Sequence, residues 1–118
     1  SDIGGSYPEA ESRLSDIALD WMVDELKDCV PSIQINENVL NRSPDPLGLQ
    51  HREDALVAFG PLRIRWKKGI RAVGDDFPLH PSVEERMRAK AVAQCGEVKP
   101  YRPAQLKERR DLKFYYDE

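Results

Sequence analysis

Apolar residues recur at three- and four-residue steps between positions 14 and 29, which predicts an amphipathic helix over about Leu14–Cys29. Ser12 stands where an N-cap is expected, and Pro31 stops the helix. The stripe is the longest in the chain and Trp21 lies at its centre, so we expect Trp21 and Met22 to be buried. The stripe consists of Leu14, Ile17, Ala18, Trp21, Met22, Leu26 and Cys29.

Four aspartates follow another face of the same segment at four-residue spacing: Asp16, Asp20, Asp24 and Asp28. Such a row is typical of a solvated helix face. It makes a poor metal site, because ligands must converge on one point and residues along a helical row point away from it. We therefore expect no metal there.

A second helix is expected to begin near Pro81 or Ser82 and to end before Gly96. Ser82 and Glu85 have the spacing of a capping box. Its apolar side would carry Val83, Met87, Ala91 and Gln94.

The rest of the chain is rich in turn signals. A short helical turn is expected at 36–40 and a tight turn at 44–48, where two prolines flank an aspartate. Residues 53–59 suit a short helix. Residues 63–67 alternate and suit a short strand, although so short a run does not separate strand from helix.

Two prolines at positions 100 and 103 favour an extended stretch around Tyr101. The aromatic tail at 112–116 is compatible with a strand or a frayed end. The expected fold class is mainly α, with irregular loops and at most short strands, in a single partial domain over residues 1–118.

Composition adds a charge asymmetry. The 118 residues are 40% apolar and 33% charged, with a net charge of −3, which alone points to no polyanionic partner. Residues 1–60 hold 4 Lys/Arg and 12 Asp/Glu, whereas residues 61–118 hold 14 and 9. The simplest interpretation is that the acidic and basic halves attract each other on folding.

Several kinds of chemistry lack their motifs. The chain has no Gly-x-Ser-x-Gly nucleophile elbow, no phosphate-binding glycine loop and no Cys/His metal spacing, so we expect no cofactor. Cys29 and Cys95 form no disulfide framework and are expected to be free, partly buried thiols, which mildly favours a reducing compartment. No stretch approaches the roughly 18 apolar residues of a membrane span.

Two histidines are available, and no internal catalytic triad is convincing. His80, directly before the second helix, suits acid–base chemistry or recognition of a substrate head group. It suits equally a cap of that helix or a partner for a loop carbonyl. His51 lies in a polar stretch and is expected to be exposed.

A basic cluster surrounds Trp66 and consists of Arg63, Arg65, Lys67, Lys68 and Arg71. Basic residues interleaved with an aromatic can contact the phosphates of nucleic acid or lipid head groups. The simpler interpretation is a charged segment that pairs with the acidic half while Trp66 is buried. We expect no nucleic-acid partner.

The opening segment, Ser1-Asp2-Ile3-Gly4-Gly5-Ser6-Tyr7-Pro8, is the most informative part of the chain. A Gly-Gly pair permits positive φ or close approach of the backbone to another group. Placed between an acid and an amphipathic helix, it suits a loop at the mouth of an active site. We expect the chain to be a piece of a longer enzyme.

Three blocks resemble the uncharacterised α/β-hydrolase-like domain family that includes phospholipase effectors of bacterial type VI secretion. The opening segment is similar to the family's His-Ser-Asp-Val-Gly-Gly-Gly-Tyr. The second block is Leu14-Ser15-Asp16-Ile17-Ala18-Leu19-Asp20-Trp21-Met22, and the third joins His80–Arg86 to Tyr101–Leu106. The blocks span about 105 of the 118 residues. Ser6 replaces a family glycine, and Gln105 stands where the family often has Asn.

The resemblance implies ester hydrolysis by a Ser–Asp–His triad, with the nucleophilic serine well upstream of Ser1 and the histidine directly before it. This chain would be the C-terminal portion of the catalytic domain, inactive alone. Its candidate catalytic residues are Asp2 and His80, and its candidate substrate loop contains Gly4, Gly5 and Tyr7. Asp2 would either orient the neighbouring histidine or cap the turn.

The implied partners are the remainder of the hydrolase domain or a second copy of the chain, covering an exposed apolar face, with phospholipid as the substrate. The implied location is the bacterial cytoplasm, with secretion into target cells. The competing interpretation is a stand-alone helical module that binds a protein or an anionic surface through its basic second half.

Overall fold

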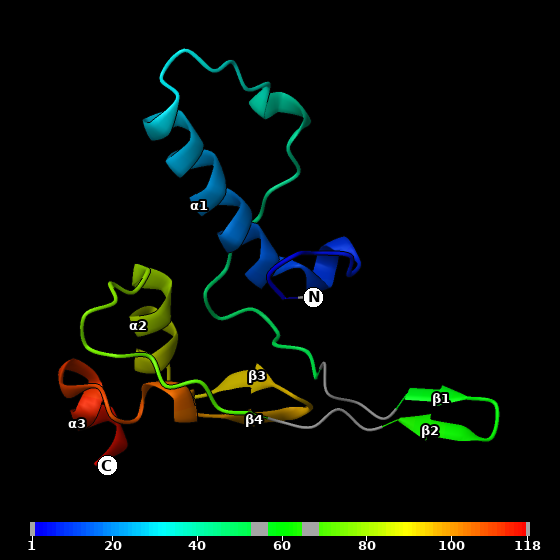
Figure 1. The fold of residues 1–118 in the computed structure, drawn as a ribbon, viewed down its shortest axis with the longest axis vertical. Helices are drawn as coiled ribbons and strands as arrows, with labels where there is room; N and C mark the ends of the chain where they lie inside the picture. Colours follow the sequence, from blue (N-terminus) through cyan, green and yellow to red (C-terminus); the bar gives the residue numbers. More distant parts are fainter. Residues whose placement is uncertain (1, 53–56, 65–68, 118) are drawn as a thin grey trace.

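The computed structural model describes residues 2–52, 57–64 and 69–117, which form a mainly helical molecule with two short antiparallel hairpins and irregular loops (Figure 1). No helix in this described part is both long and apolar enough to cross a bilayer. The helices are α1 (Arg13–Cys29), α2 (Pro81–Arg88) and α3 (Lys113–Tyr116); the strands are β1 (Val57–Phe59), β2 (Leu62–Ile64), β3 (Val92–Gln94) and β4 (Glu97–Lys99).

The core lies in residues 73–116, which we call the C-terminal unit. Met87 on α2 is its deepest side chain, 1% exposed, and it clusters with Leu106, Leu112 and Tyr115. The cluster is bordered by half-buried apolar side chains: Val73, Leu79, Val83, Tyr101 and Tyr116. This part of the chain therefore closes a small core from its own residues.

Two arginines link separate segments of the C-terminal unit through hydrogen bonds to backbone carbonyls. Arg109 is buried and its Nη1 donates to the carbonyls of Gly74 and Phe77, both at 2.7 Å. Arg102 Nε donates to the Tyr115 carbonyl at 2.7 Å, and its Nη1 donates to the Met87 carbonyl at 2.9 Å. The tail is consequently helical and packed, so the expectation of a strand or frayed end at 112–116 was wrong.

The expected first helix is confirmed as α1, which ends at Cys29 before Pro31. The prediction that Trp21 and Met22 are buried is wrong, because their side chains are 48% and 58% exposed. The side of α1 that packs against the chain is polar, since Ser15 and Asp16 are buried there along with Val23.

The 42–48 segment covers this polar side. The amide of Ser43 donates to Asp16 Oδ2 at 2.8 Å, and Arg42 pairs with Asp20 at 2.7 Å. The aspartate row is thus not a solvated face at its first two positions. An apolar stripe is buried only if the chain supplies an apolar surface to cover it, and this loop offers backbone donors and a cation instead.

Gly48 allows the loop to approach α1 closely. A Cβ at this position would lie 2.7 Å from Arg13 Cβ and 3.1 Å from the Asp45 carbonyl oxygen. The Gly48 amide donates to that carbonyl at 3.0 Å, which closes the turn expected at 44–48. The helical turn expected at 36–40 is also present, over Glu37–Val39.

The second helix is shorter than expected. Helix α2 ends at Arg88, and residues that were assigned to its last turns form the β3–β4 hairpin. Cys95 and Gly96 both have positive φ, 51° and 83°. Two such residues between paired strands are typical of a type I′ turn, which suits a two-residue hairpin. Gln94 is therefore a strand residue.

The β1–β2 hairpin replaces the short helix expected at 53–59, at least over Val57–Phe59; residues 53–56 lie outside the described residues. Strand β2 covers Leu62–Ile64, whereas the strand was expected at 63–67, of which 65–67 also lie outside the described residues. Gly60 at the turn has φ 59°. Figure 1 shows this hairpin extending away from the helices.

The segment at 46–51 connects α1 to the C-terminal unit. Gln50 forms a parallel bridge with Gln94, with its amide donating to the Ala93 carbonyl at 3.0 Å and its carbonyl accepting from the Cys95 amide at 2.8 Å. This contact and Arg86, described below, position α1 opposite α2.

Candidate functional site

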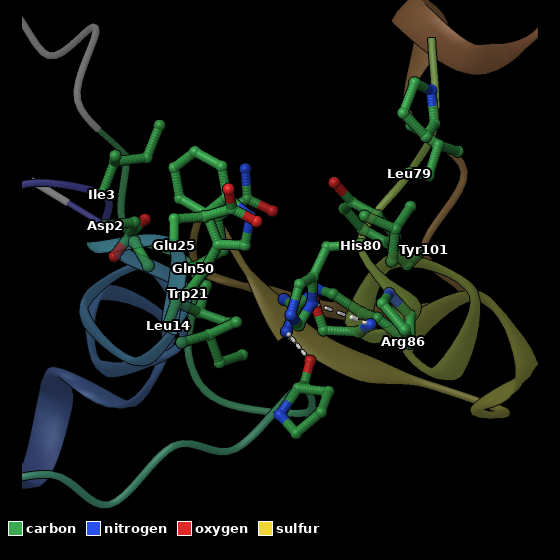
Figure 2. A pocket seen from close by; sticks show the side chains of 17 residues that line it. Asp2, Ile3, Leu14, Trp21, Glu25, Gln50, Leu79, His80, Arg86 and Tyr101 are labelled. Atoms are coloured by element: carbon green, nitrogen blue, oxygen red, sulfur yellow. Dashed lines mark hydrogen bonds between the residues drawn. The ribbon is translucent and has the colours of Figure 1, made fainter. Parts of the chain in front are cut away.

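An apolar pocket of about 840 Å³ lies between α1 and the chain that leads into α2 (Figure 2). One wall is the N-terminal half of the α1 stripe: Leu14, Ile17, Ala18 and Trp21. The opposite wall carries Pro78, Leu79, Pro81 and Val83. The polar groups at the pocket include Asp2, Glu25, Gln50, His80, Ser82, Arg86 and Tyr101. Such a mixture of apolar walls and a few polar groups is typical of small-molecule sites.

Asp2 borders this pocket and is held by His51. Its Oδ1 lies 2.7 Å from His51 Nδ1, and its Oδ2 accepts the His51 amide at 2.7 Å. The other ring nitrogen of His51 lies 3.2 Å from Glu11 Oε2. The hydrogen bond with Asp2 raises the pKa of His51 above 6.5, more than burial lowers it, and Glu11 adds to the rise.

His51 is accordingly not the exposed residue that was expected, since its side chain is 14% exposed. With both ring nitrogens facing carboxylates, protonated His51 donates on both sides. A general base needs a nitrogen free to accept a proton from the nucleophile. The Asp2–His51 pair therefore orders the N-terminal loop, and His51 is unsuited to be the base of a triad in this arrangement.

Tyr7 completes the attachment of the opening loop. Its ring stacks on His51, with centroids 3.6 Å apart and an interplanar angle of 12°. Gly5 has φ 86°, as the Gly-Gly pair predicted, and Ser6 has φ 85° at the position where the resembled family has glycine. A Cβ on Gly5 would meet no atom within 4 Å, so conformation, not close approach, is what requires glycine here.

His80 takes the capping role that was one of its two expected alternatives. It is the N-cap of α2, and its Nδ1 accepts the Ser82 amide at 3.2 Å and lies 2.8 Å from Ser82 Oγ. Ser82 is thus inside the helix and not at a capping-box N-cap. His80 nevertheless lines the pocket, so capping and a ligand contact are compatible.

Arg86 reaches from α2 to the 46–48 loop and to β3. Its Nη1 donates to the Pro46 and Gly48 carbonyls at 2.9 and 2.6 Å, and its Nη2 donates to the Ala93 carbonyl at 3.1 Å. The guanidinium carbon lies 4.9 Å from the centre of the Tyr101 ring. Burial lowers the pKa of Arg86 and raises the pKa of Tyr101.

The structure therefore brings Asp2 and His80 to one pocket but pairs Asp2 with His51 instead of His80. Gly4, Gly5 and Tyr7 belong to the loop behind Asp2 and are not among the pocket-lining residues. The roles of His51 and Arg86 were not predicted from the sequence. His51 pairs with Asp2, which lies 49 residues away in the sequence. Arg86 donates to the carbonyls of Pro46 and Gly48, which lie 40 and 38 residues away, and to Ala93 on the unpredicted strand β3. No local spacing in the sequence could reveal these contacts.

The other candidate groups from the sequence, namely metal ligands, cysteines and the basic cluster, add no further residue to this site. Within residues 2–52, 57–64 and 69–117, no three His, Cys, Asp or Glu side chains are arranged to hold a metal ion. Cys29 and Cys95 are free, as expected, but the expectation that they are partly buried was wrong, since both are exposed. Of the basic cluster, Arg65, Trp66, Lys67 and Lys68 lie outside the described residues.

No family model, no curated protein and no solved structure matches this chain.

Proposed function

We propose that this chain is the C-terminal portion of the catalytic domain of a lipase-like serine hydrolase, with an α/β-hydrolase-like fold completed by sequence upstream of Ser1. Its pocket would hold the apolar part of an ester substrate, of which phospholipid is the case the resemblance suggests. The observation that carries the proposal is the position of Asp2 and Ile3 at the edge of an apolar pocket walled by α1.

That position matters because of the resemblance. In the similar family motif a histidine precedes the residue equivalent to Ser1, two positions before Asp2. Because each residue advances the chain by at most about 3.6 Å, a histidine there would stand within about 7 Å of the pocket edge along the chain. A general base at the mouth of an apolar pocket is what ester hydrolysis of a lipid requires.

The exposed stripe of α1 gives independent support. Trp21, Met22 and Leu26 are each more than 40% exposed on one side of a well-formed helix. Apolar surface of this kind is normally covered by another part of the domain or by a partner. The remainder of the hydrolase domain is the occupant that the proposal names, and a second copy of this chain is the alternative.

The test is to express the complete open reading frame and the 118-residue chain side by side. Both are treated with a fluorophosphonate probe and assayed with a short-chain ester and a phospholipid. The complete protein should hydrolyse ester and carry the label on a serine upstream of Ser1, whereas the chain alone should do neither, because it has no placed nucleophile.

Two results would overturn the proposal. One is inhibitor-sensitive turnover by the 118-residue chain alone. The other is an open reading frame in which no Gly-x-Ser-x-Gly segment precedes Ser1. The second result would favour the stand-alone interaction module, for which the exposed face of α1 would be the contact surface.

A further inference from the structure

Arg86 is a buried cation that has no anionic hydrogen-bond partner among residues 2–52, 57–64 and 69–117. It is 4% exposed, and its three bonds go to neutral carbonyl oxygens of Pro46, Gly48 and Ala93. Its Nε is buried and has no acceptor among the described residues. Arg109, equally buried at 4% exposed, shows the usual solution, because it pairs with Asp111 through Nε at 3.0 Å and Nη2 at 2.8 Å.

The Nε–H group of Arg86 can therefore still donate a hydrogen bond to a bound anion. Burying a cation without a hydrogen-bonded anion is unfavourable. Asp2 and Asp45 act on Arg86 only through space, without a hydrogen bond. Arginine binds carboxylates and phosphates with two parallel hydrogen bonds through the guanidinium edge formed by Nε and Nη2. On Arg86, Nη2 also donates to the Ala93 carbonyl at 3.1 Å, so Nε is the group on this edge that has no acceptor among the described residues.

This guanidinium edge belongs to a residue that lines the apolar pocket, and Figure 2 shows Arg86 among the side chains that surround it. The wall opposite carries the apolar residues of α1. The two carboxylates at the pocket belong to the other wall: Asp2 is occupied by His51, and Glu25 lies one helical turn beyond Trp21. An anionic group is thus favoured toward α2 and an aliphatic chain along α1.

We propose that the pocket binds an amphiphile with an anionic head group, carboxylate or phosphate, whose head is held by Arg86 and whose aliphatic chain lies along Leu14, Ile17 and Trp21. The proposal goes beyond the hydrolase assignment and does not rest on it, because binding requires only the 118-residue chain and no nucleophile.

The test is a titration of the 118-residue chain carrying Trp66→Phe, so that Trp21 at the pocket wall is the reporting fluorophore. The probes share one chain length and differ in head group: decanoate, decyl phosphate, decan-1-ol and decylammonium. The two anions should bind at least about tenfold more tightly than the alcohol, the usual worth of hydrogen bonds to a charged group. The tighter anion identifies the head group.

Three variants complete the experiment. Arg86→Gln should abolish the preference for anions, and Ala18→Phe, which fills the pocket, should weaken all the probes that bind. Arg88→Gln, which neutralises an exposed arginine on the same helix, should change nothing. If circular dichroism shows that Arg86→Gln does not fold, the head-group series and Ala18→Phe still test whether the pocket binds an anionic amphiphile. Equal affinity for decanoate, decyl phosphate and decan-1-ol, or no change in Trp21 emission with any probe, would overturn the proposal.

Discussion

The C-terminal unit and α1 both carry apolar side chains at helical spacing, but within the described residues the C-terminal unit buries its apolar cluster whereas α1 leaves Trp21, Met22 and Leu26 more than 40% exposed. Met87 on α2 is 1% exposed beneath α3 and its flanking turns, whereas Met22 on α1 is 58% exposed. Helix α1 is instead held by its polar side, through Asp16 and Asp20. Amphipathicity therefore establishes the helix in both regions, and only the presence of a complementary surface decides whether the stripe is buried.

The two methionines give the largest test of this comparison. Met87→Ala should lower the free energy of unfolding by about 2–5 kcal/mol, the usual cost of emptying a core site. Met22→Ala, the same substitution on α1, should stay within about 0.5 kcal/mol of the parent, as expected for an exposed position. Urea denaturation measures both. Similar decreases in unfolding free energy for the two variants would show that Met22 is as well packed as Met87.

The polar attachment of α1 is tested at Gly48. Gly48→Ala should destabilise by about 1–3 kcal/mol, since the added Cβ would overlap Arg13 Cβ and force the loop away from the helix. Gly69→Ala is the matched control, because a Cβ there meets no atom within 4 Å. Equal stability of the two variants would mean that the loop does not depend on this close approach.

Substitution in the opening loop tests whether the α1 region carries the proposed hydrolase function in the complete protein. Gly5→Val should cut turnover at least about tenfold, or roughly 1.4 kcal/mol of barrier, because a β-branched residue is strained at φ 86° and would shift the loop that holds Asp2. Global stability should fall much less. Full turnover in a folded Gly5→Val enzyme would make this segment an ordinary surface turn.

The smallest effect concerns pH. Asp2 and Glu11 raise the pKa of His51 in the folded chain above its unfolded value of about 6.5. The stabilisation is therefore complete below pH 6.5 and is lost as the pH rises through the folded pKa. Its size should be below about 1 kcal/mol, since the groups are near the surface.

The variant that isolates this effect is Asp2→Asn, which keeps the shape of the side chain but removes the charge facing His51. Its unfolding free energy should vary less between about pH 6 and pH 9 than that of the parent. The loss relative to the parent should be larger at the acidic end. An unchanged pH profile would show that the carboxylate of Asp2 does not hold the His51 proton.

Much of the local structure could be predicted from the sequence, because local signals determine it. The limits of α1, the turn at 44–48 and positive φ at Gly5 all follow from periodicity, proline and glycine. The β3–β4 hairpin was missed because Met87 and Ala91 continue a helical spacing, while the turn depends on Cys95 taking positive φ beside Gly96.

The site was less accessible to prediction because its contacts are long-range. Asp2 and His80 were candidate catalytic residues and both line the pocket, but the partner of Asp2 is His51, 49 residues away. The prediction that Trp21 is buried was wrong because periodicity identifies an apolar stripe without identifying which residues cover it. Among the described residues, the apolar stripe of α1 therefore lacks the cover that the C-terminal unit has.

Exposure of the α1 stripe can be measured through the oxidation of the two methionines by hydrogen peroxide, followed by peptide mass spectrometry. In the 118-residue chain, Met22 should form sulfoxide much faster than Met87, which serves as the buried internal standard. In the complete protein, Met22 should become protected while Met87 stays slow, because under the proposed function the rest of a hydrolase domain would cover α1. If Met22 is already protected in the chain alone, the stripe of α1 is covered without a partner; if Met22 reacts equally fast in both proteins, the rest of the protein does not cover α1.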